Sequence, residues 1–359
     1  MSNARKLAAN LPKEGQLFER NVLVNGAMNI AQRATSASGV CASSGYYVCD
    51  RWAIGASTSG RFSMAQNTDS PNGFNNSLSL ACTTADTSIA STESLVLRQI
   101  IEGQNLQQFA KGSSDAKEFA VSFYVKGNAS ATYTCELFDG DNSRQISKTF
   151  SVTTSWTRVV LTFPADTTGA FADDNGISLY FNIWLHAGSN FTSGTLNSTS
   201  WAANTNANRV SSSQTSFLDS TSRVFYITGI QLEAEGAGAT PFEHEPYETT
   251  LRKCQRYYHN SFHAGKTPGV DTADANHIIT TSWNDGNCNF PPFPVVMRGA
   301  PTITLRSRNT NNTAKVTQNS SEKTAHVSGI GTKGGEYVQI TSGGAGLWTA
   351  FSYECDAEL

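Results

Sequence analysis

The sequence predicts an all-β protein whose main part is an antiparallel β-sandwich followed by a second, smaller β domain. Between Glu118 and Leu185, apolar and polar residues alternate in consecutive segments, which is the period of a strand with one buried face. The segments are separated by turns rich in Gly, Asn and Asp, which favour hairpins. Only 15% of the residues are charged, which is typical of a β protein with hydroxyl and amide surfaces.

The alternation identifies one core-facing set in each of these strands. In the first strand the apolar residues occupy the odd positions from Phe119 to Val125. The later sets are Tyr133, Cys135 and Leu137; Val159, Leu161 and Phe163; and Leu179, Phe181, Ile183 and Leu185. Further alternating strands precede them, and the segment 224–232 closes the sandwich.

The chain divides into three parts by composition. Residues 1–20 contain too little apolar surface to fold alone, so they form either an attachment segment or a disordered tail. Residues 21–247 form the main domain, with a long polar insertion at 187–222. A proline-rich edge ends it, and residues 248–359 follow, beginning with a short helix and continuing as β-strands separated by Gly-, Asn- and Pro-rich turns.

Charge, leader and cysteine patterns exclude several classes of protein. The net charge is −3 and basic runs are short, which argues against nucleic acid as a partner. No segment has the length of a secretory signal core or a membrane span, so we expect folding in the cytosol and no membrane insertion. The seven cysteines include no C-x-x-C pair, and we expect buried free thiols.

No catalytic or metal-binding motif is present at a convincing spacing. The sequence lacks the nucleophile elbow, the P-loop and the H-E-x-x-H zinc pattern. His259 and His263 are four residues apart, but we interpret them as surface histidines because no third ligand is near. We therefore predict no enzyme activity, no metal and no cofactor.

A binding surface is the functional feature that the pattern supports. If Leu179 to Leu185 face the core, then Tyr180, Asn182, Trp184 and His186 face outwards. An indole flanked by amide and imidazole groups suits a sugar, whose ring face stacks while its hydroxyls form hydrogen bonds. We expect Tyr124 and Glu136 on the same face, and Trp201 of the insertion is a further candidate. The alternatives are packing under the insertion or a neighbouring subunit, and for Trp201 a local anchor.

Several segments together carry a family resemblance. They are the run from Ser122 to Gly169 and the motifs NVLVNGAMNIAQR, DRW, LRQIIEG, GSN-FTSGTLN, ITGIQLE, ATPFE, CQRYY and the terminal DAEL. The first run, with the strand at 224–243, resembles the jelly roll of carbohydrate-binding modules, and the wider pattern resembles phage tail-fibre and other virion-surface proteins. The resemblance implies a jelly-roll domain in a homotrimeric, non-enzymatic virion component that touches the host.

The predicted function is therefore adhesion of a phage particle to a host surface glycan, without catalysis. The expected partners are the glycan, further copies of the chain and other virion proteins bound through residues 1–20, with synthesis in the bacterial cytoplasm and the virion surface as destination. A capsid or tail decoration protein that stabilises the particle is the alternative, and a glycan-cleaving enzyme is the minor one.

Overall fold

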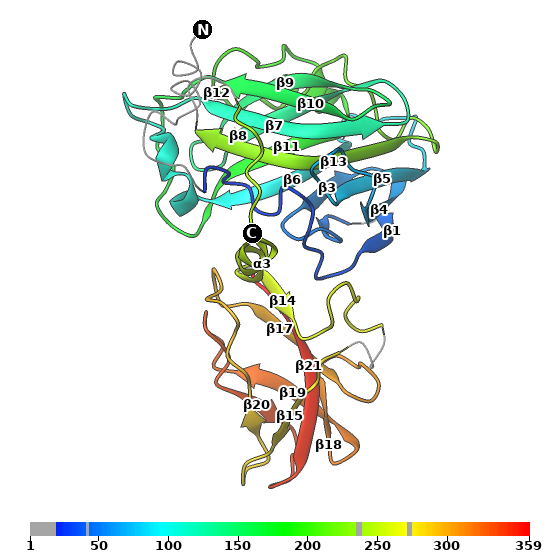
Figure 1. The fold of residues 1–359 in the computed structure, drawn as a ribbon, viewed down its shortest axis with the longest axis vertical. Helices are drawn as coiled ribbons and strands as arrows, with labels where there is room; N and C mark the ends of the chain where they lie inside the picture. The colour runs from blue at the N-terminus through cyan, green and yellow to red at the C-terminus, as the bar shows by residue number, and fades with distance from the viewer. Residues whose placement is uncertain (1–18, 41–42, 235–238, 271–274) are drawn as a thin grey trace. The chain divides into compact units, whose positions relative to one another are not determined.

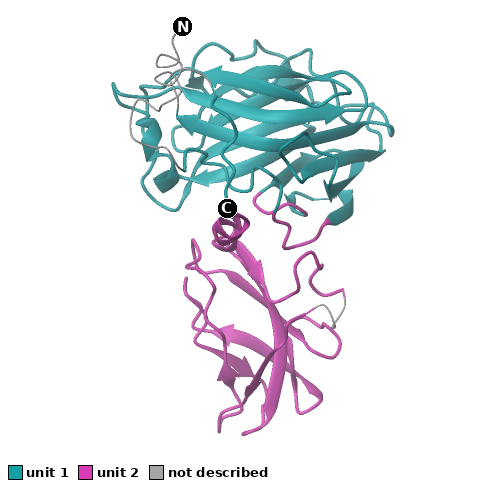
Figure 2. Cartoon of the chain, in the orientation of Figure 1, with its two compact units in different colours: residues 1–29, 36–47, 52–245 teal, residues 30–35, 48–51, 246–359 magenta. Residues whose placement is uncertain are grey.

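The computed structural model describes residues 19–40, 43–234, 239–270 and 275–359 (Figure 1). Contacts between Cα atoms divide the chain into two compact units, shown in Figure 2. Unit 1 comprises residues 1–29, 36–47 and 52–245, and unit 2 comprises residues 30–35, 48–51 and 246–359. Most of the N-terminal segment 1–20, predicted to attach the chain to a particle, lies outside the described residues.

Unit 1 contains two antiparallel sheets. The first has six strands in the order β1-β4-β5-β13-β7-β10. Its strands are β1 (Ser36–Val40), β4 (Arg61–Asn67), β5 (Ser77–Thr84), β7 (Phe119–Gly127), β10 (Thr157–Phe163) and β13 (Val224–Ala234). The second has seven strands in the order β12-β9-β8-β11-β6-β3-β2. Its strands are β2 (Gly45–Tyr46), β3 (Ala53–Ser57), β6 (Ser94–Glu102), β8 (Ala131–Asp139), β9 (Arg144–Val152), β11 (Ile177–Ala187) and β12 (Ala202–Ala203).

The two sheets pack face to face as a jelly-roll sandwich. The rings of Tyr133 on β8 and Phe225 on β13 lie 5.5 Å apart, and those of Phe123 on β7 and Phe150 on β9 lie 4.9 Å apart. Each pair joins one sheet to the other across the core. The apolar sets predicted from the alternation are buried, because a period of two places every second side chain on the same face. The predicted fold class is therefore confirmed.

Strands that follow one another in sequence do not all share a sheet. β7 pairs with β10 and β13, whereas β8 pairs with β9 and β11. The chain passes from one sheet to the other between Gly127 and Ala131. Outward-facing residues of β7 and β11 consequently lie on opposite surfaces of the sandwich.

Short helices and the insertion decorate unit 1. They are η1 (Gly103–Asn105), η2 (Gln107–Phe109), α2 (Ser189–Thr192) and η3 (Asn206–Asn208). The predicted insertion at 187–222 contains α2, β12 and η3, and backbone hydrogen bonds fold it on itself and on the sheet. Val210 N–H donates to Phe191 O at 3.0 Å, and Thr215 N–H donates to Thr132 O at 2.9 Å. The insertion is therefore an ordered cover on the seven-stranded sheet.

Unit 2 is built around its last strand. β21 (Trp348–Asp356) pairs with four other strands, and β19, β20 and β16 extend the sheet. The remaining elements are α3 (Tyr247–Gln255), β14 (Tyr258–Asn260), β15 (Ile278–Thr281), β16 (Cys288–Asn289), β17 (Thr302–Ser307), β18 (Lys315–Gln318), β19 (Ser321–Ser328) and β20 (Tyr337–Ile340). Its core includes Phe290, Met297, Leu305 and Phe351.

Two short upstream segments, 30–35 and 48–51, belong to unit 2 although the sequence analysis placed them in the main domain. Arg33 forms ion pairs with Asp356 and Glu358, at 3.0 and 3.3 Å, and Arg51 pairs with Glu358. The guanidinium of Arg51 also lies 3.4 Å from the centre of the Tyr257 ring. The residues of the three ion pairs are 323, 325 and 307 positions apart in sequence, so local pattern could not reveal them.

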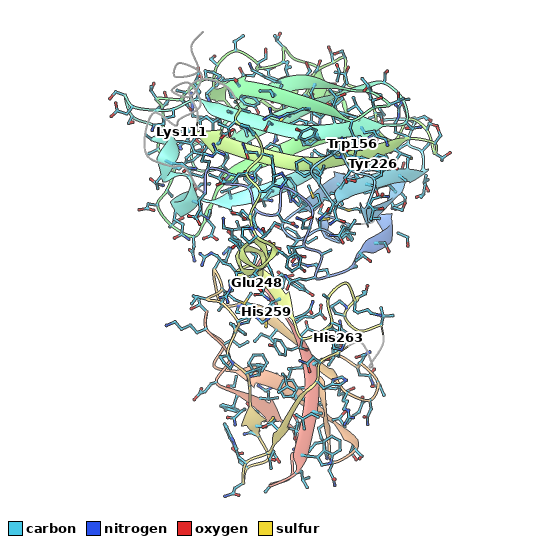
Figure 3. All side chains as sticks on the ribbon, viewed as in Figure 1. Lys111, Trp156, Tyr226, Glu248, His259 and His263 are labelled. Atoms are coloured by element: carbon cyan, nitrogen blue, oxygen red, sulfur yellow. The ribbon has the colours of Figure 1, made fainter. Side chains whose placement is uncertain are left out.

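The prediction of surface histidines is wrong for one of the two (Figure 3). His263 is exposed, but His259 is only 2% exposed because it lies on β14, which pairs with β21. The His259 ring packs against Phe293 and Tyr353. Six cysteines, all buried, are free thiols; Cys41 lies outside the described residues. No helix among the described residues has the length and hydropathy to cross a membrane.

Candidate functional site

A groove of about 410 Å³ lies on the outer face of the seven-stranded sheet. Residues from β3, β6, β8 and β11 form its floor, and the insertion and the segment before β2 form its sides. The lining residues are Ser44, Gly55, Ala56, Ser57, Ser94, Val96, Arg98, Phe138, Tyr180, Asn182, Trp184, Phe191 and Arg209. The volume falls within the range of roughly 300–1,000 Å³ that is usual for ligand pockets.

Strand register brings the floor together. On β11, Asn182 lies opposite Arg98 of β6 and Trp184 lies opposite Val96, so both pairs share one face. Asn182 also lies opposite Glu136 of β8, and Tyr180 lies opposite Phe138. The outward set Tyr180, Asn182 and Trp184 is thus extended on both sides by side chains from neighbouring strands.

A buried carboxylate holds the floor in place. Glu136 is 0% exposed, and its Oε2 accepts hydrogen bonds from Asn182 Nδ2 at 2.9 Å and Trp184 Nε1 at 2.8 Å. Arg209 of the insertion donates from Nε to Oε1 at 2.7 Å and from Nη2 to Oε2 at 2.9 Å. A bidentate arginine and two neutral donors occupy both oxygens, so Glu136 orients the groove side chains and is sealed beneath them.

The aromatic surface offered to a ligand is mainly that of Tyr180 and Phe138. Trp184 is only 3% exposed because Val96, Val210 and Phe191 pack against it. The Tyr180 and Phe138 rings are half-buried and lie 5.6 Å apart in an edge-to-face arrangement. The indole predicted as a stacking platform therefore forms part of the groove wall.

Two guanidinium groups line the groove, and they differ in their pairing. Arg209 is held by Glu136, and its guanidinium lies 5.0 Å from the ring centres of Phe138 and Trp184. Arg98 lies 6.0 Å from the Tyr180 ring centre and forms no ion pair with any residue that the structure describes. None of the described lining residues is an aspartate or glutamate. Among the described residues, the positive charge of Arg98 thus has no acidic partner at the groove.

Gly55 makes room for that charge. A Cβ atom at this position of β3 would lie 3.3 Å from Cζ and 3.4 Å from Nη1 of Arg98. Those separations are at the lower limit of ordinary contacts, so the missing side chain lets the guanidinium lie directly on the strand.

His186 does not face the groove, which corrects the sequence prediction. The pairing of β11 with β6 shifts register between Trp184 and His186, so that His186 lies opposite Leu95. Leu95 is fully buried in the core, whereas Ser94 and Val96 on either side of it line the groove. The extra residue of this β-bulge turns His186 to the other face of the sheet.

Tyr124 also lies on a different surface from Tyr180. It belongs to β7 of the six-stranded sheet, and its ring lies 5.3 Å from that of Phe74. The same surface carries Trp156 and Tyr226, labelled in Figure 3, with ring centres 6.1 Å apart. Period two showed correctly that Tyr124 points outward, but it could not show which sheet β7 joins.

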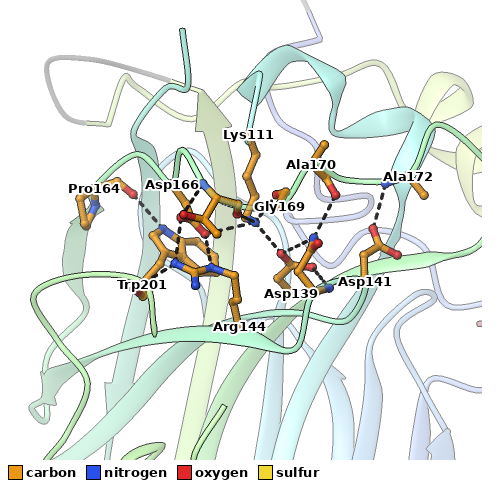
Figure 4. Close-up of polar contacts among 12 residues, drawn as sticks. Lys111, Asp139, Asp141, Arg144, Pro164, Asp166, Gly169, Ala170, Ala172 and Trp201 are labelled. Carbon is orange, nitrogen blue, oxygen red and sulfur yellow. Dashed lines mark hydrogen bonds and ion pairs between the residues drawn. The ribbon is translucent and has the colours of Figure 1, made fainter. Parts of the chain in front are cut away.

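Trp201 acts as a local anchor, which was the alternative reading (Figure 4). Its Nε1 donates to Pro164 O at 2.8 Å, and its ring packs 5.3 Å from that of Phe119. Lys111 Nζ lies 5.6 Å from the ring centre, within a cluster that includes Arg144 and Asp166. Trp201 is 7% exposed and is not among the groove residues.

Four groove residues were not predicted from the sequence: Gly55, Arg98, Phe138 and Arg209. Phe138 is two residues beyond Glu136 on the same strand, so the alternation already placed it on the outer face. Arg98 follows the same rule on β6, in step with Val96. Arg209 lies in the insertion, where no periodicity applies, and only the fold brings it to Glu136.

No protein-family model and no curated protein matches the sequence. Among solved structures, a family 11 carbohydrate-binding module from Clostridium thermocellum, in complex with a β-1,3-1,4-mixed-linked tetrasaccharide, is 10% identical, with TM-score 0.30, over 59% of this chain and 99% of the module. The module TmCBM61, in complex with β-1,4-galactotriose, is 10% identical, with TM-score 0.32, over 60% of this chain and 100% of the module.

A third similar structure is the enzymatically active domain of tailspike protein 4 of bacteriophage CBA120. It is 10% identical, with TM-score 0.31, and the match covers 60% of this chain but only 22% of that one. Identities this low assign no ligand to the groove of this chain.

Proposed function

We propose that the protein binds a glycan carrying an acidic group in the groove of the seven-stranded sheet, and that it does so without cleaving the glycan. The observation that carries this proposal is Arg98, which forms no ion pair with a described residue and lies beside the half-buried Tyr180 ring, in a groove whose described lining contains no acidic residue. A sugar stacks on such a ring through its C–H face, and a carboxylate or sulfate group pairs with a guanidinium in a bidentate manner.

The neutral part of the lining suits sugar hydroxyls. Asn182, Ser44 and Ser57 offer amide and hydroxyl groups at the groove surface. Backbone of β3 is also accessible there, because Gly55 and Ala56 carry little or no side chain. A site with few charged groups, several hydroxyls and one aromatic platform is the usual composition of a sugar site.

The floor argues for binding without turnover. Hydrolysis of a glycosidic bond ordinarily requires two carboxyl groups that flank the bond. Glu136 supplies a carboxylate beneath the floor, but it is fully buried and both its oxygens accept hydrogen bonds from groove residues. The side chain is thereby committed to holding Asn182, Trp184 and Arg209.

The biological setting that we propose is the surface of a phage particle. In this proposal residues 1–20 attach the chain to other virion proteins, three copies associate, and the groove meets a polysaccharide of the bacterial host. Its support is the sequence resemblance to virion-surface proteins together with a groove suited to an acidic polymer. Light scattering of the purified protein tests the trimer, and a protein lacking residues 1–20 that no longer joins particles would support the attachment role.

The deciding experiment measures binding of the purified protein to acidic and neutral oligosaccharides and to extracted bacterial surface polysaccharide. Two variants are compared: Tyr180→Ala in the groove, and Trp156→Ala in the turn before β10 of the other sheet, where the side chain is also half-buried. We expect the wild type and Trp156→Ala to bind alike, and Tyr180→Ala to lose about tenfold in affinity, which is roughly 1.4 kcal/mol.

Three outcomes would contradict the proposal. Equal binding by Tyr180→Ala would remove the groove as the site. Absence of binding to any acidic glycan by the folded protein would favour a decoration role, tested by the stability of particles that lack the protein. Release of reducing sugar during incubation would establish an enzyme.

A further inference from the structure

A second polar cluster lies outside the groove, where the loop between β5 and β6 meets the end of β11. Asp86 follows β5, Glu93 immediately precedes β6, and His186 is the residue turned inward by the bulge in β11. One nitrogen or oxygen atom from each lies within 4.8 Å of the others. His186 is 0% exposed, Asp86 is 4% exposed and the Glu93 side chain is 15% exposed.

The His186 ring has one occupied and one unoccupied nitrogen. Nδ1 forms a hydrogen bond with Ser216 Oγ at 2.8 Å. Nε2 is buried and has no hydrogen-bond partner among the described residues, and the nearest carboxylate oxygen, Glu93 Oε2, is 3.7 Å away. That distance is too long for a hydrogen bond. Buried polar atoms are nearly always satisfied, so a nitrogen directed at two carboxylates without a bond to either requires an explanation.

The hydrogen bond at Nδ1 leaves Nε2 as the ring nitrogen that can accept a ligand bond. When Nδ1 carries the ring proton, Nε2 has a lone pair within 4.8 Å of the carboxylates of Asp86 and Glu93. A cation between the three groups would give the buried nitrogen a partner and neutralise the adjacent carboxylates.

We propose that His186 Nε2 and one carboxylate oxygen each from Asp86 and Glu93 bind a divalent transition-metal ion, with Zn²⁺ as the best fit. For tetrahedral Zn²⁺ with bonds of about 2.1 Å, neighbouring ligand atoms lie about 3.4 Å apart. The separation of 3.7 Å between Nε2 and Oε2 is close to this. An imidazole among the ligands favours Zn²⁺ over Ca²⁺ and Mg²⁺, which prefer sites made of oxygen alone. Water would complete the coordination on the partly exposed side of Glu93.

Neighbouring groups hold each of the three ligands in position, as outer partners do in metal sites. Asp86 Oδ2 accepts hydrogen bonds from Thr58 Oγ1 at 2.5 Å and Ser59 N–H at 3.1 Å. Glu93 Oε2 accepts one from Ala90 N–H at 2.7 Å. Ser216, which holds Nδ1 of His186, is itself fixed by the Leu218 N–H at 3.0 Å.

A metal at this position would brace one wall of the groove. Gly188 N–H donates to Glu93 O at 2.8 Å, and Asn190 N–H donates to Ser91 O at 2.9 Å, so the loop that carries two of the ligands supports the start of α2. The loop approaches so closely that a Cβ on Gly188 would lie 2.1 Å from Ala90 O. α2 carries Phe191, which lines the groove.

The test uses the full chain treated with EDTA and then dialysed, titrated with Zn²⁺ in a calorimeter. We expect one saturable Zn²⁺ per chain, an increase in melting temperature on loading, and visible absorption of tetrahedral type when Co²⁺ replaces Zn²⁺. In Glu93→Gln we expect the affinity for Zn²⁺ to fall at least about tenfold. His186→Gln should lose binding altogether, and His326→Gln, at an exposed position in unit 2, is the control that should bind as wild type.

The variants also define what would overturn the proposal. Because His186 is fully buried, His186→Gln is compared with the wild type only if it melts cooperatively. If it does not, Glu93→Gln decides, because Glu93 is partly exposed and glutamine has nearly the same shape. No saturable Zn²⁺ in the wild type, or equal Zn²⁺ affinity in Glu93→Gln, would refute the site. Tighter binding of Ca²⁺ than of Zn²⁺ would refute the assignment to a transition metal.

Discussion

Two buried carboxylates three residues apart on β8 have different surroundings. Glu136 and Asp139 are both 0% exposed, and both are paired with a cation. Glu136 lies under an open groove, and its partners Asn182, Trp184 and Arg209 are groove residues. Asp139 lies at the end of the strand, where Lys111 reaches it at 2.5 Å and Asn142 caps it with two hydrogen bonds of 3.0 Å (Figure 4).

In the cluster around Asp139, the charged side chains pair with one another. Lys111 Nζ also donates to the carbonyl oxygens of Thr168 and Gly169, and it lies 3.1 Å from Asp166, which Arg144 binds through two further hydrogen bonds. Burial would raise the pKa of Asp166, but the hydrogen bonds from Arg144 and Lys111 outweigh it and keep the pKa below 3.8. Burial of a charge is therefore no sign of function by itself. The groove is distinguished by Arg98, which lines it and has no ion-pair partner in the described part of the chain.

The largest effect is expected for Lys111→Met, which removes the lysine that pairs with both Asp139 and Asp166. Two buried carboxylates would lose a partner, and breaking a buried ion pair in this way costs about 3–5 kcal/mol of stability. Urea unfolding measures the loss, and glycan affinity of the folded fraction should not change. Lys148→Met, at a half-buried lysine of β9, is the control and should stay within about 0.5 kcal/mol. If Lys111→Met lost glycan binding without losing stability, the cluster around Lys111 would be part of the binding site and not a purely structural element.

The second-largest effect is expected at His259 in unit 2, whose pKa is shifted by burial. Burial lowers its pKa from 6.5 to about 4, so the native state favours the neutral ring. The free energy of unfolding is therefore unaffected by His259 above pH 6.5 and decreases as the pH falls towards 4. The total decrease is about 3 kcal/mol at 1.36 kcal/mol per pKa unit. Urea unfolding at pH 7 and pH 4 should show a steeper loss in the wild type than in His259→Gln.

Comparing the wild type with His259→Gln separates the titration of His259 from that of Asp50, which changes stability with pH in the opposite direction. Burial raises the pKa of Asp50 to about 6, so its contribution is lost as the pH rises from 3.8 through 6. Asp50 is present in both proteins and cancels in the comparison. Identical pH profiles for wild type and variant would show that His259 is not shielded from water in solution.

A smaller effect, on binding alone, is expected for Arg98→Gln. A hydrogen bond to a charged group contributes about 1.5–3 kcal/mol, so affinity for an acidic oligosaccharide should fall at least about tenfold. The dependence of binding on salt should weaken as well, because the screened charge is removed. Lys126→Gln is the matched control, since Lys126 is on the opposite sheet and is paired with Asp69 at 2.5 Å. An unchanged affinity in Arg98→Gln would rule out acidic recognition while leaving the groove as a site for neutral sugars.

The smallest effect is expected for Gly55→Ala. The new Cβ would press on the Arg98 guanidinium, which can shift by a few tenths of an ångström, so affinity should fall by about twofold to fivefold, or less than about 1 kcal/mol. Gly299→Ala, where a Cβ would meet no atom within 4 Å, should leave both stability and affinity unchanged. Affinity equal to wild type in Gly55→Ala would mean that the position of Arg98 on β3 is not part of the site.

Prediction from sequence succeeded where the cause is local. The core faces of β7, β8, β10 and β11 follow from their alternation, and α3 follows from helical spacing after Pro246. Tyr180, Asn182 and Trp184 were identified together because they share one strand and one face. It failed for His186, because a bulge changes the period within the strand, and for His259, because its strand pairs with β21, which is distant in sequence.

The sequence by itself determined that the chain is a β-sandwich and which face of each strand is buried, because side-chain alternation is a property of the single strand. Only the tertiary structure decided which strands are neighbours, and with them the site. Tyr124 was separated from the groove by a crossing between sheets, whereas Arg98 and Arg209 were brought to β11 from positions 84 and 27 residues away from Asn182. Which sheet each strand joins depends on burial summed over the whole core, a quantity that no local pattern of residues contains.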